Sequence, residues 1–102
     1  MEKKRLGKNK RAEAIKSTIV PILKRHDVAK AGIFGSFARG DMKKGSDVDI
    51  LVQFKGRKSL LDLAGLEMEL ETALKRKVDA ITYSSLHPLL KKQVIKGQVR
   101  II

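Results

Sequence analysis

The sequence predicts a single α/β domain built on a small mixed central sheet with flanking helices. Segments whose apolar residues recur at helical spacing alternate along the chain with short apolar runs that are typical of strands. The chain has 102 residues, the length of one ordinary domain, and 42% of them are hydrophobic, which suffices for one core. It contains no Cys and no Trp, so aliphatic packing must hold that core together.

The N-terminal part predicts a basic tail and then a helix. Residues 1–8 are polar, basic and aperiodic, which predicts a flexible tail, and residues 9–102 form the predicted domain. From Asn9, a suitable helix cap, apolar residues recur at helical spacing as far as His26, which we expect at the helix end. Pro21 interrupts this pattern, so the helix should kink there or restart.

Two strands are predicted next, joined by a turn. Residues 29–34 form a short apolar run that leads into Gly35-Ser36 and the helix-compatible residues 37–39, which predicts a strand-to-helix turn. Residues 47–53 alternate between apolar and other side chains, which predicts a second strand with an acidic face at its start.

The C-terminal half predicts two helices and two strands. Ser59 can cap a helix over residues 60–76, and residues 77–82 read as a third strand. Ser84 or Ser85 is the expected cap of a last helix that contains Pro88 and ends at Gly97, followed by an edge strand over residues 99–102.

The charge of the chain is strongly positive. Lys and Arg number 23 against 11 Asp and Glu, a net charge of +12, which favours polyanions such as nucleic acid or nucleotide phosphates, or an acidic partner protein. A solvated basic surface explains the same charge equally well. No apolar run reaches the roughly 20 residues that cross a bilayer, and no signal peptide is recognisable, so we expect a cytoplasmic protein without membrane association.

Three aspartates are the candidate catalytic and metal-binding residues. Asp47 and Asp49 stand two apart in a strand, so their side chains point the same way with Cα atoms about 6.5 to 7 Å apart. Such carboxylates can converge on one or two cations, and a pair of metal ions suits displacement at phosphorus. Hard oxygen ligands favour Mg²⁺ or Mn²⁺. Asp79 can supply a third carboxylate if its strand lies beside the second.

A candidate anion site precedes the aspartates. Gly35 lets the backbone approach a phosphate, and Ser36 can donate a hydroxyl and an N–H at the start of the following helix. Arg39 could reach a phosphate or could pair with Asp41. Either motif alone is weak, because Asp-x-Asp and Gly-Ser pairs are common, but their order and position at strand ends strengthen the interpretation.

The combined pattern resembles a known family. Gly-Ser-x-Ala-Arg-Gly from Gly35, followed by Ser-Asp-x-Asp from Ser46, resembles the signature of the minimal nucleotidyltransferases in the polymerase-β-like superfamily, and Val78-Asp79 looks like the third carboxylate. The resemblance implies the polymerase-β-like fold. It also implies that Gly35 and Ser36, with Arg39 and Ser46, bind the nucleoside triphosphate, and that the three aspartates bind two magnesium ions.

The resemblance further implies a reaction and a partner. The family typically transfers AMP from ATP to an acceptor hydroxyl, and members often act as antitoxins that modify a tyrosine of a HEPN-type toxin. This is the leading hypothesis. One competing hypothesis is a non-catalytic module that binds a toxin or nucleic acid through the basic surface. Another is nucleotidyl transfer to RNA or to a small molecule such as an aminoglycoside.

The helix over residues 60–76 carries a second apolar stripe. Leu61, Ala64 or Gly65, and Met68 lie beyond the positions that one core contact requires. Two apolar faces indicate an interface, either for self-association or for the partner. The alternative is a helix buried on both sides.

Overall fold

The computed structural model describes residues 2–35 and 47–102. Its elements are α1 (Glu2–Arg25), β1 (Val28–Phe34), β2 (Val48–Phe54), α3 (Leu60–Leu74), β3 (Val78–Thr82), the 3₁₀ turn η1 (Tyr83–Ser85), α4 (Pro88–Gly97) and β4 (Val99–Arg100). The short helix predicted at residues 37–39 lies outside the described residues. In the described ranges, no helix is both long and apolar enough to span a membrane.

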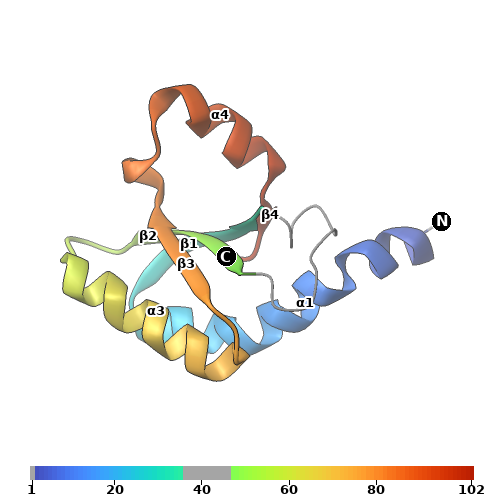
Figure 1. Ribbon diagram of the computed structural model, residues 1–102, viewed down its shortest axis with the longest axis horizontal. Helices are drawn as coiled ribbons and strands as arrows, with labels where there is room; N and C mark the ends of the chain where they lie inside the picture. Colours follow the sequence, from blue (N-terminus) through green and yellow to red (C-terminus); the bar gives the residue numbers. More distant parts are fainter. Residues whose placement is uncertain (1, 36–46) are drawn as a thin grey trace.

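The strands form one mixed sheet in the order β3-β2-β1-β4. β1 runs antiparallel to β2 and β4, whereas β2 and β3 run parallel. Figure 1 shows α1 and α3 together on one side of this sheet, with α4 on the other side. The predicted α/β class with a small mixed sheet and flanking helices is confirmed, and β4 confirms the predicted edge strand, although it is shorter.

The hydrophobic core lies between the sheet and the helices α1 and α3. Alternate residues of β2 point into it, because successive side chains of a strand face opposite sides. Leu66 and Leu70 of α3 are fully buried against this face, and so are Ile19 and Leu23 of α1. The strand residues of the core include Val28, Ala31, Ile33, Val48, Ile50, Val52 and Val78.

Helix α3 begins where the sequence predicts. Ser59 is its N-cap, and the Asp62 N–H donates to the Ser59 hydroxyl at 3.3 Å while the Ser59 N–H donates to the Asp62 carboxylate at 2.8 Å. This reciprocal pair satisfies two backbone donors that a helix start leaves free. The hydrogen bonds from Ser59 hold the pKa of Asp62 below its ordinary value. The helix ends at Leu74, before the predicted Arg76, because Lys75 takes a left-handed conformation.

Polar contacts tie α1 to α3. His26 lies at the end of α1, as predicted, with its Nε2 atom 2.7 Å from Glu69 Oε1, and Arg25 pairs with the same carboxylate. The hydrogen bond with His26 is the main cause of a lowered pKa for Glu69. The two helices that cover the core face are therefore joined at their polar rim as well as through the core.

Two predicted helix starts are wrong. α1 begins at Glu2 rather than Asn9, because Lys, Arg, Glu and Leu are good helix formers even without a periodic pattern, and the helix continues through Pro21 without restarting. The division into a tail and a domain at residue 8 stays a prediction. α4 is capped by His87, whose Nδ1 atom accepts from the Leu89 N–H at 3.1 Å, and not by Ser84 or Ser85, which belong to η1.

The second apolar stripe of α3 is exposed. Leu61 is 83% and Met68 68% exposed, and Ala64 and Gly65 between them are also exposed. The alternative of a helix buried on both sides is therefore wrong for this chain.

Candidate active site

The register of β2 and β3 brings two of the predicted carboxylates side by side. Asp49 and Asp79 are direct neighbours in the parallel pairing of these strands, so they share one face of the sheet. Val48 and Val78, which precede them, are buried on the opposite face against the helices. The prediction that Asp79 lies on the same side as Asp49 is confirmed.

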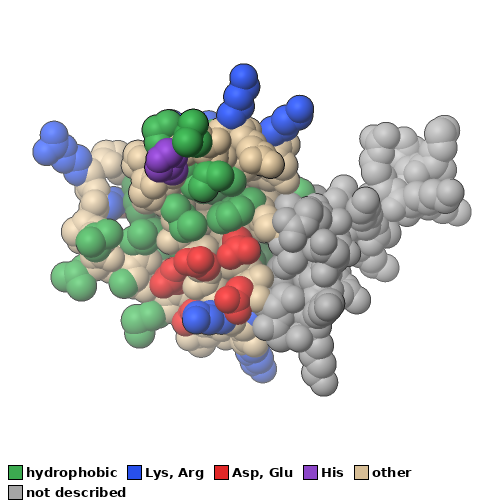
Figure 2. All heavy atoms as spheres, turned by 45° about the horizontal axis from the view of Figure 1, so that its top comes forward, with side chains coloured by type: hydrophobic (Ala, Val, Ile, Leu, Met, Phe, Trp, Pro, Cys, Tyr) green, Lys and Arg blue, Asp and Glu red, His purple; other side chains and the backbone are tan. Residues whose placement is uncertain are grey.

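Asp47 lies in the segment just before β2. It precedes Asp49 by two positions and is exposed, as is Asp79, while Asp49 is half-buried. Figure 2 shows Asp and Glu side chains gathered in the middle of this face, next to the residues drawn in grey. Two of the three carboxylates are thus open to solvent, at the end of the sheet where β2 and β3 begin.

The carboxylates do not form a ready-made metal cage. Among the described residues, no three His, Cys, Asp or Glu side chains are grouped closely enough to hold a metal ion. The donor chemistry nevertheless fits Mg²⁺ or Mn²⁺, because carboxylate oxygens are the hard ligands that these ions prefer. The register places Asp49 and Asp79 next to each other, so rotations of side chains would suffice to bring their oxygens together.

Gly35 brings the turn after β1 against Asp49. Its φ is +73°, a left-handed conformation that favours glycine, and an added Cβ would lie 2.3 Å from Asp49 Oδ2. The sequence indicated this glycine as a phosphate contact, and the structure adds a second reason for it. The other predicted nucleotide-binding residues, Ser36, Arg39 and Ser46, lie outside the described residues.

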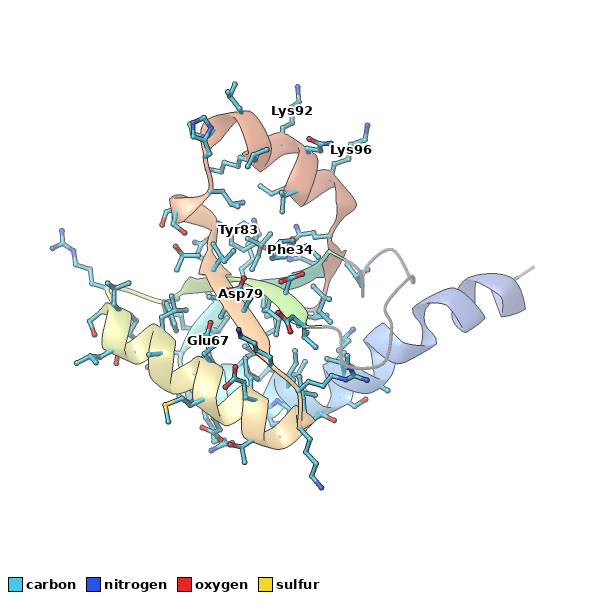
Figure 3. The ribbon with its side chains drawn as sticks, in the orientation of Figure 1. Phe34, Glu67, Asp79, Tyr83, Lys92 and Lys96 are labelled. Carbon is cyan, nitrogen blue, oxygen red and sulfur yellow. The ribbon has the colours of Figure 1, made fainter. Side chains whose placement is uncertain are left out.

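Two glutamates that the sequence analysis missed hold β3 in place. Glu67 Oε2 accepts from the Ala80 N–H at 2.8 Å, and Glu71 Oε2 accepts from the Val78 N–H at 3.0 Å. These N–H groups belong to the residues on either side of Asp79 in the edge strand β3. Figure 3 labels Glu67 on α3 and Asp79 on the neighbouring β3. The only sequence signal is that Glu67 and Glu71 stand four apart on α3, which places them on one helix face.

Beyond the acidic residues, the same sheet face becomes apolar and then basic. Behind Asp49 and Asp79 along the strands come the buried Leu51 and the partly buried Ile81, and Tyr83 follows β3. Tyr83 Oη donates to Gln98 Oε1 at 2.8 Å, and Lys30 Nζ lies 4.9 Å from the centre of its ring. Burial raises the pKa of Tyr83.

Gly32 lets the segment after α4 approach the sheet. A Cβ at this position would lie 2.0 Å from Gln98 Oε1, so the Gln98 side chain rests directly on the backbone of β1. Because Gln98 also accepts from Tyr83, it links β1, β4 and η1 on this face. The apolar middle of the face is therefore covered, whereas the acidic end is open.

A mixed sheet that presents paired aspartates beside a glycine turn defines the nucleotidyltransferase class. The chain belongs to the family of the nucleotidyltransferase domain, whose model matches residues 16–101. The prediction that this chain is an enzyme of that class is confirmed.

Two relatives with curated names support this assignment. A protein of Methanocaldococcus jannaschii, MJ0435, provisionally named a protein adenylyltransferase, is 51% identical over 86% of this chain and 95% of its own length. The protein adenylyltransferase MntA of Thermococcus cleftensis is 44% identical over 74% of this chain and 76% of its own length.

Solved structures share the fold. One, provisionally described as a minimal nucleotidyltransferase, is 33% identical with a TM-score of 0.78, and covers 89% of this chain and 93% of its own. A chain from the complex of a tri-AMPylated Shewanella oneidensis HEPN toxin with an MNT antitoxin is 21% identical with a TM-score of 0.70, over 88% of this chain and 71% of its own. The second likeness shows the fold alone. The predicted membership of the minimal nucleotidyltransferases and the polymerase-β-like fold are confirmed.

Proposed function

We propose that this chain transfers AMP from ATP to a hydroxyl group of a partner protein, and that the partner is a HEPN-type toxin which the chain neutralises. The observation that carries the reaction is the pairing of Asp49 with Asp79, together with the Gly35 turn that lies against the Asp49 carboxylate. This arrangement places hard anionic ligands next to a backbone turn that can receive a phosphate. Because ATP is the donor, we place the reaction in the cytoplasm.

The proposed roles follow from the chemistry of each residue. Asp47, Asp49 and Asp79 would hold two Mg²⁺ ions, which when bound neutralise phosphate charge and polarise the reacting oxygens. Gly35, with Ser36, Arg39 and Ser46, would hold the triphosphate. The acceptor oxygen then forms a bond to the α-phosphorus of ATP, while the bond from that phosphorus to the oxygen bridging to the β-phosphorus breaks. Pyrophosphate leaves with the electron pair of the broken bond. The proton of the acceptor hydroxyl passes to a nearby carboxylate or to water. The protein contributes chiefly alignment and electrostatic stabilisation.

The identity of the partner is supported by the relatives. Thermococcus MntA is named a protein adenylyltransferase, and the Shewanella MNT antitoxin is in complex with a HEPN toxin that carries AMP. The acidic end of this sheet is exposed, with Asp47 and Asp79 open to solvent, so a side chain of another molecule can approach it.

The test is AMP transfer to a purified HEPN-type partner in the presence of ATP and Mg²⁺, measured by intact mass spectrometry. We expect mass increases of whole AMP units, and we expect the double variant Asp47→Ala with Asp49→Ala to abolish them, a loss on the order of a thousandfold or more. Asp27→Asn is the matched control, because Asp27 is an exposed carboxylate that follows α1 and bonds Lys58. Undiminished transfer by the double variant would contradict the proposal.

The competing acceptors are tested in the same experiment. Labelled ATP is incubated with the chain and RNA, or with an aminoglycoside, in place of the protein partner. Label that appears on either of these and not on the protein would replace the proposed acceptor while keeping the proposed chemistry.

A further inference from the structure

A cavity of ≈ 540 Å³ lies where β2 and β3 end, at the opposite end of these strands from the aspartates. Its lining includes residues at the ends of the two strands and cations from the loop after β2 and from α4. In Figure 1 that loop and the segment from η1 into α4 border the same end of the sheet. Six of the lining residues are Phe54, Arg57, Lys58, Tyr83, Ser84 and Lys91.

The charge around this cavity is positive. Arg57, Lys58 and Lys91 line it, and no carboxylate among the described residues does so. Lys58 already forms an ion pair with Asp27, whose Oδ2 atom lies 3.0 Å from Lys58 Nζ. In the described part of the chain, the side chains of Arg57 and Lys91 have neither a hydrogen-bond partner nor an ion-pair partner. Two cations are therefore available to an anionic ligand.

The remaining lining fits a ligand that is only partly charged. Two aromatic residues, Phe54 and Tyr83, and two hydroxyl-bearing residues, Thr82 and Ser84, are part of the lining. A volume of this size lies within the roughly 300 to 1,000 Å³ that is typical of small-molecule sites. Guanidinium, ammonium and hydroxyl donors together suit phosphate oxygens, which accept several hydrogen bonds at once.

We propose that this cavity binds a phosphate-bearing small molecule, with no need for a metal ion and separately from the acidic end of the sheet. The phosphate contacts Arg57 and Lys91, and any uncharged part of the ligand lies against Phe54 and Tyr83. Because the three cations sit on the loop after β2 and on α4, the bound ligand would join two segments that are far apart in the sequence.

The experiment is calorimetric titration of the full chain in EDTA, with pyrophosphate in one arm and ADP in the other. EDTA removes the metal that phosphate binding at the acidic end requires. We expect one site per chain. The variant Arg57→Ala with Lys91→Ala should weaken binding at least tenfold, roughly, because the loss of a single charge-assisted hydrogen bond lowers affinity by about that factor. Tighter binding of ADP than of pyrophosphate identifies a nucleotide as the ligand, whereas equal affinity identifies free phosphate compounds.

The matched control is Lys92→Ala with Lys96→Ala. These lysines lie on the same helix but do not line the cavity, and Figure 3 shows them on the side of α4 that faces away from the sheet. The control removes the same number of positive charges, two, and should change affinity less than about twofold to threefold. Equal weakening by both double variants would mean that only the overall positive charge attracts phosphate, and this would overturn the proposal.

A third variant tests whether binding requires the cavity itself or only the positive charge around it. Ser84→Trp fills the cavity from an exposed position while every cation stays in place. Binding should be lost if the ligand enters the cavity, and circular dichroism checks that the variant is folded. Unchanged binding by Ser84→Trp, or no binding by the unmodified chain, would refute the site. Both readouts are independent of AMP transfer, so the failure of either proposal leaves the other testable.

Discussion

The two ends of the β2-β3 pair differ in how they are built. At the acidic end, the strand register makes Asp49 and Asp79 neighbours, and the backbone of Gly35 packs closely against the Asp49 carboxylate. At the basic end, the ends of β2 and β3 line part of the cavity, but its cations come from the loop after β2 and from α4, a helix without a fully buried residue. One end therefore depends on the sheet itself, and the other on segments that pack onto it.

Because of this difference, the two ends should attract phosphate in different ways. Carboxylates repel phosphate unless a cation lies between them, so binding at the acidic end should require metal. Arg57 and Lys91 attract phosphate directly. The net charge of +12 hides this division, because the acidic side chains that matter are concentrated at one place on the sheet.

Among variants that leave the three aspartates in place, the largest expected effect comes from Gly35→Ala. The added Cβ would lie 2.3 Å from Asp49 Oδ2, and the left-handed backbone adds a strain of about 1 to 2 kcal/mol. Displacement of the Asp49 carboxylate should lower the rate of AMP transfer on the order of a hundredfold, since misplacement by about 1 Å can cost that much. The measurement is the initial rate with saturating ATP.

Gly56→Ala is the matched control at the other end. Gly56 has a similar φ of +69°, but a Cβ there would meet nothing within 4 Å. Both variants carry the same kind of backbone strain, so both should lose some stability in a denaturant titration. If Gly56→Ala slows AMP transfer as much as Gly35→Ala does, the contact with Asp49 is not the cause.

An intermediate effect is expected from Glu67→Ala. This variant removes the acceptor of the Ala80 N–H and loosens β3 beside Asp79, so AMP transfer should fall roughly tenfold. Glu67→Gln keeps an acceptor oxygen and should recover most of the rate. Glu69→Gln is the control, because Glu69 contacts α1 instead of β3. The rates are measured against Mg²⁺ concentration, where a loosened Asp79 should raise the concentration needed for half-maximal activity.

A result in which Glu67→Gln is as slow as Glu67→Ala would mean that the charge of Glu67, and not its hydrogen bond, matters at this site. The strand contact would then be structural only. The strand register would then position Asp79 without help from the bond between Glu67 and the Ala80 N–H.

Much of the acidic end could be predicted from the sequence because it depends on short-range periodicity. Strand alternation fixes the relation of Asp47 to Asp49, and buried valines beside Asp49 and Asp79 fix which face each strand turns to the core. Ser59 and Asp62 form a local capping box, which is equally readable. The metal occupancy and the roles of these residues stay predictions.

What the sequence analysis missed depends on contacts between distant segments. The bonds of Glu67 and Glu71 to β3 require α3 to lie along the free edge of the sheet, which no local pattern specifies. The His87 cap was missed because serines are the commoner caps, yet Ser84 and Ser85 are used in η1. The basic cavity arises only when Arg57 and Lys91 are brought together by folding.

The smallest expected effect concerns Tyr83, at the basic end. It is the only tyrosine and the chain has no Trp, so phenolate absorbance reports on this residue alone. Burial raises its pKa, so the midpoint of its titration in the folded chain should lie above the value of about 10 found in denaturant. The contribution of the neutral Tyr83 phenol to the free energy of unfolding is therefore complete below a pH of about 10, and it is lost as the pH rises through the pKa of the folded chain. The variant Tyr83→Phe should not show this loss. A folded midpoint at or below that of the denatured chain would mean that water reaches the phenol freely, and that the basic end is as open as the acidic end.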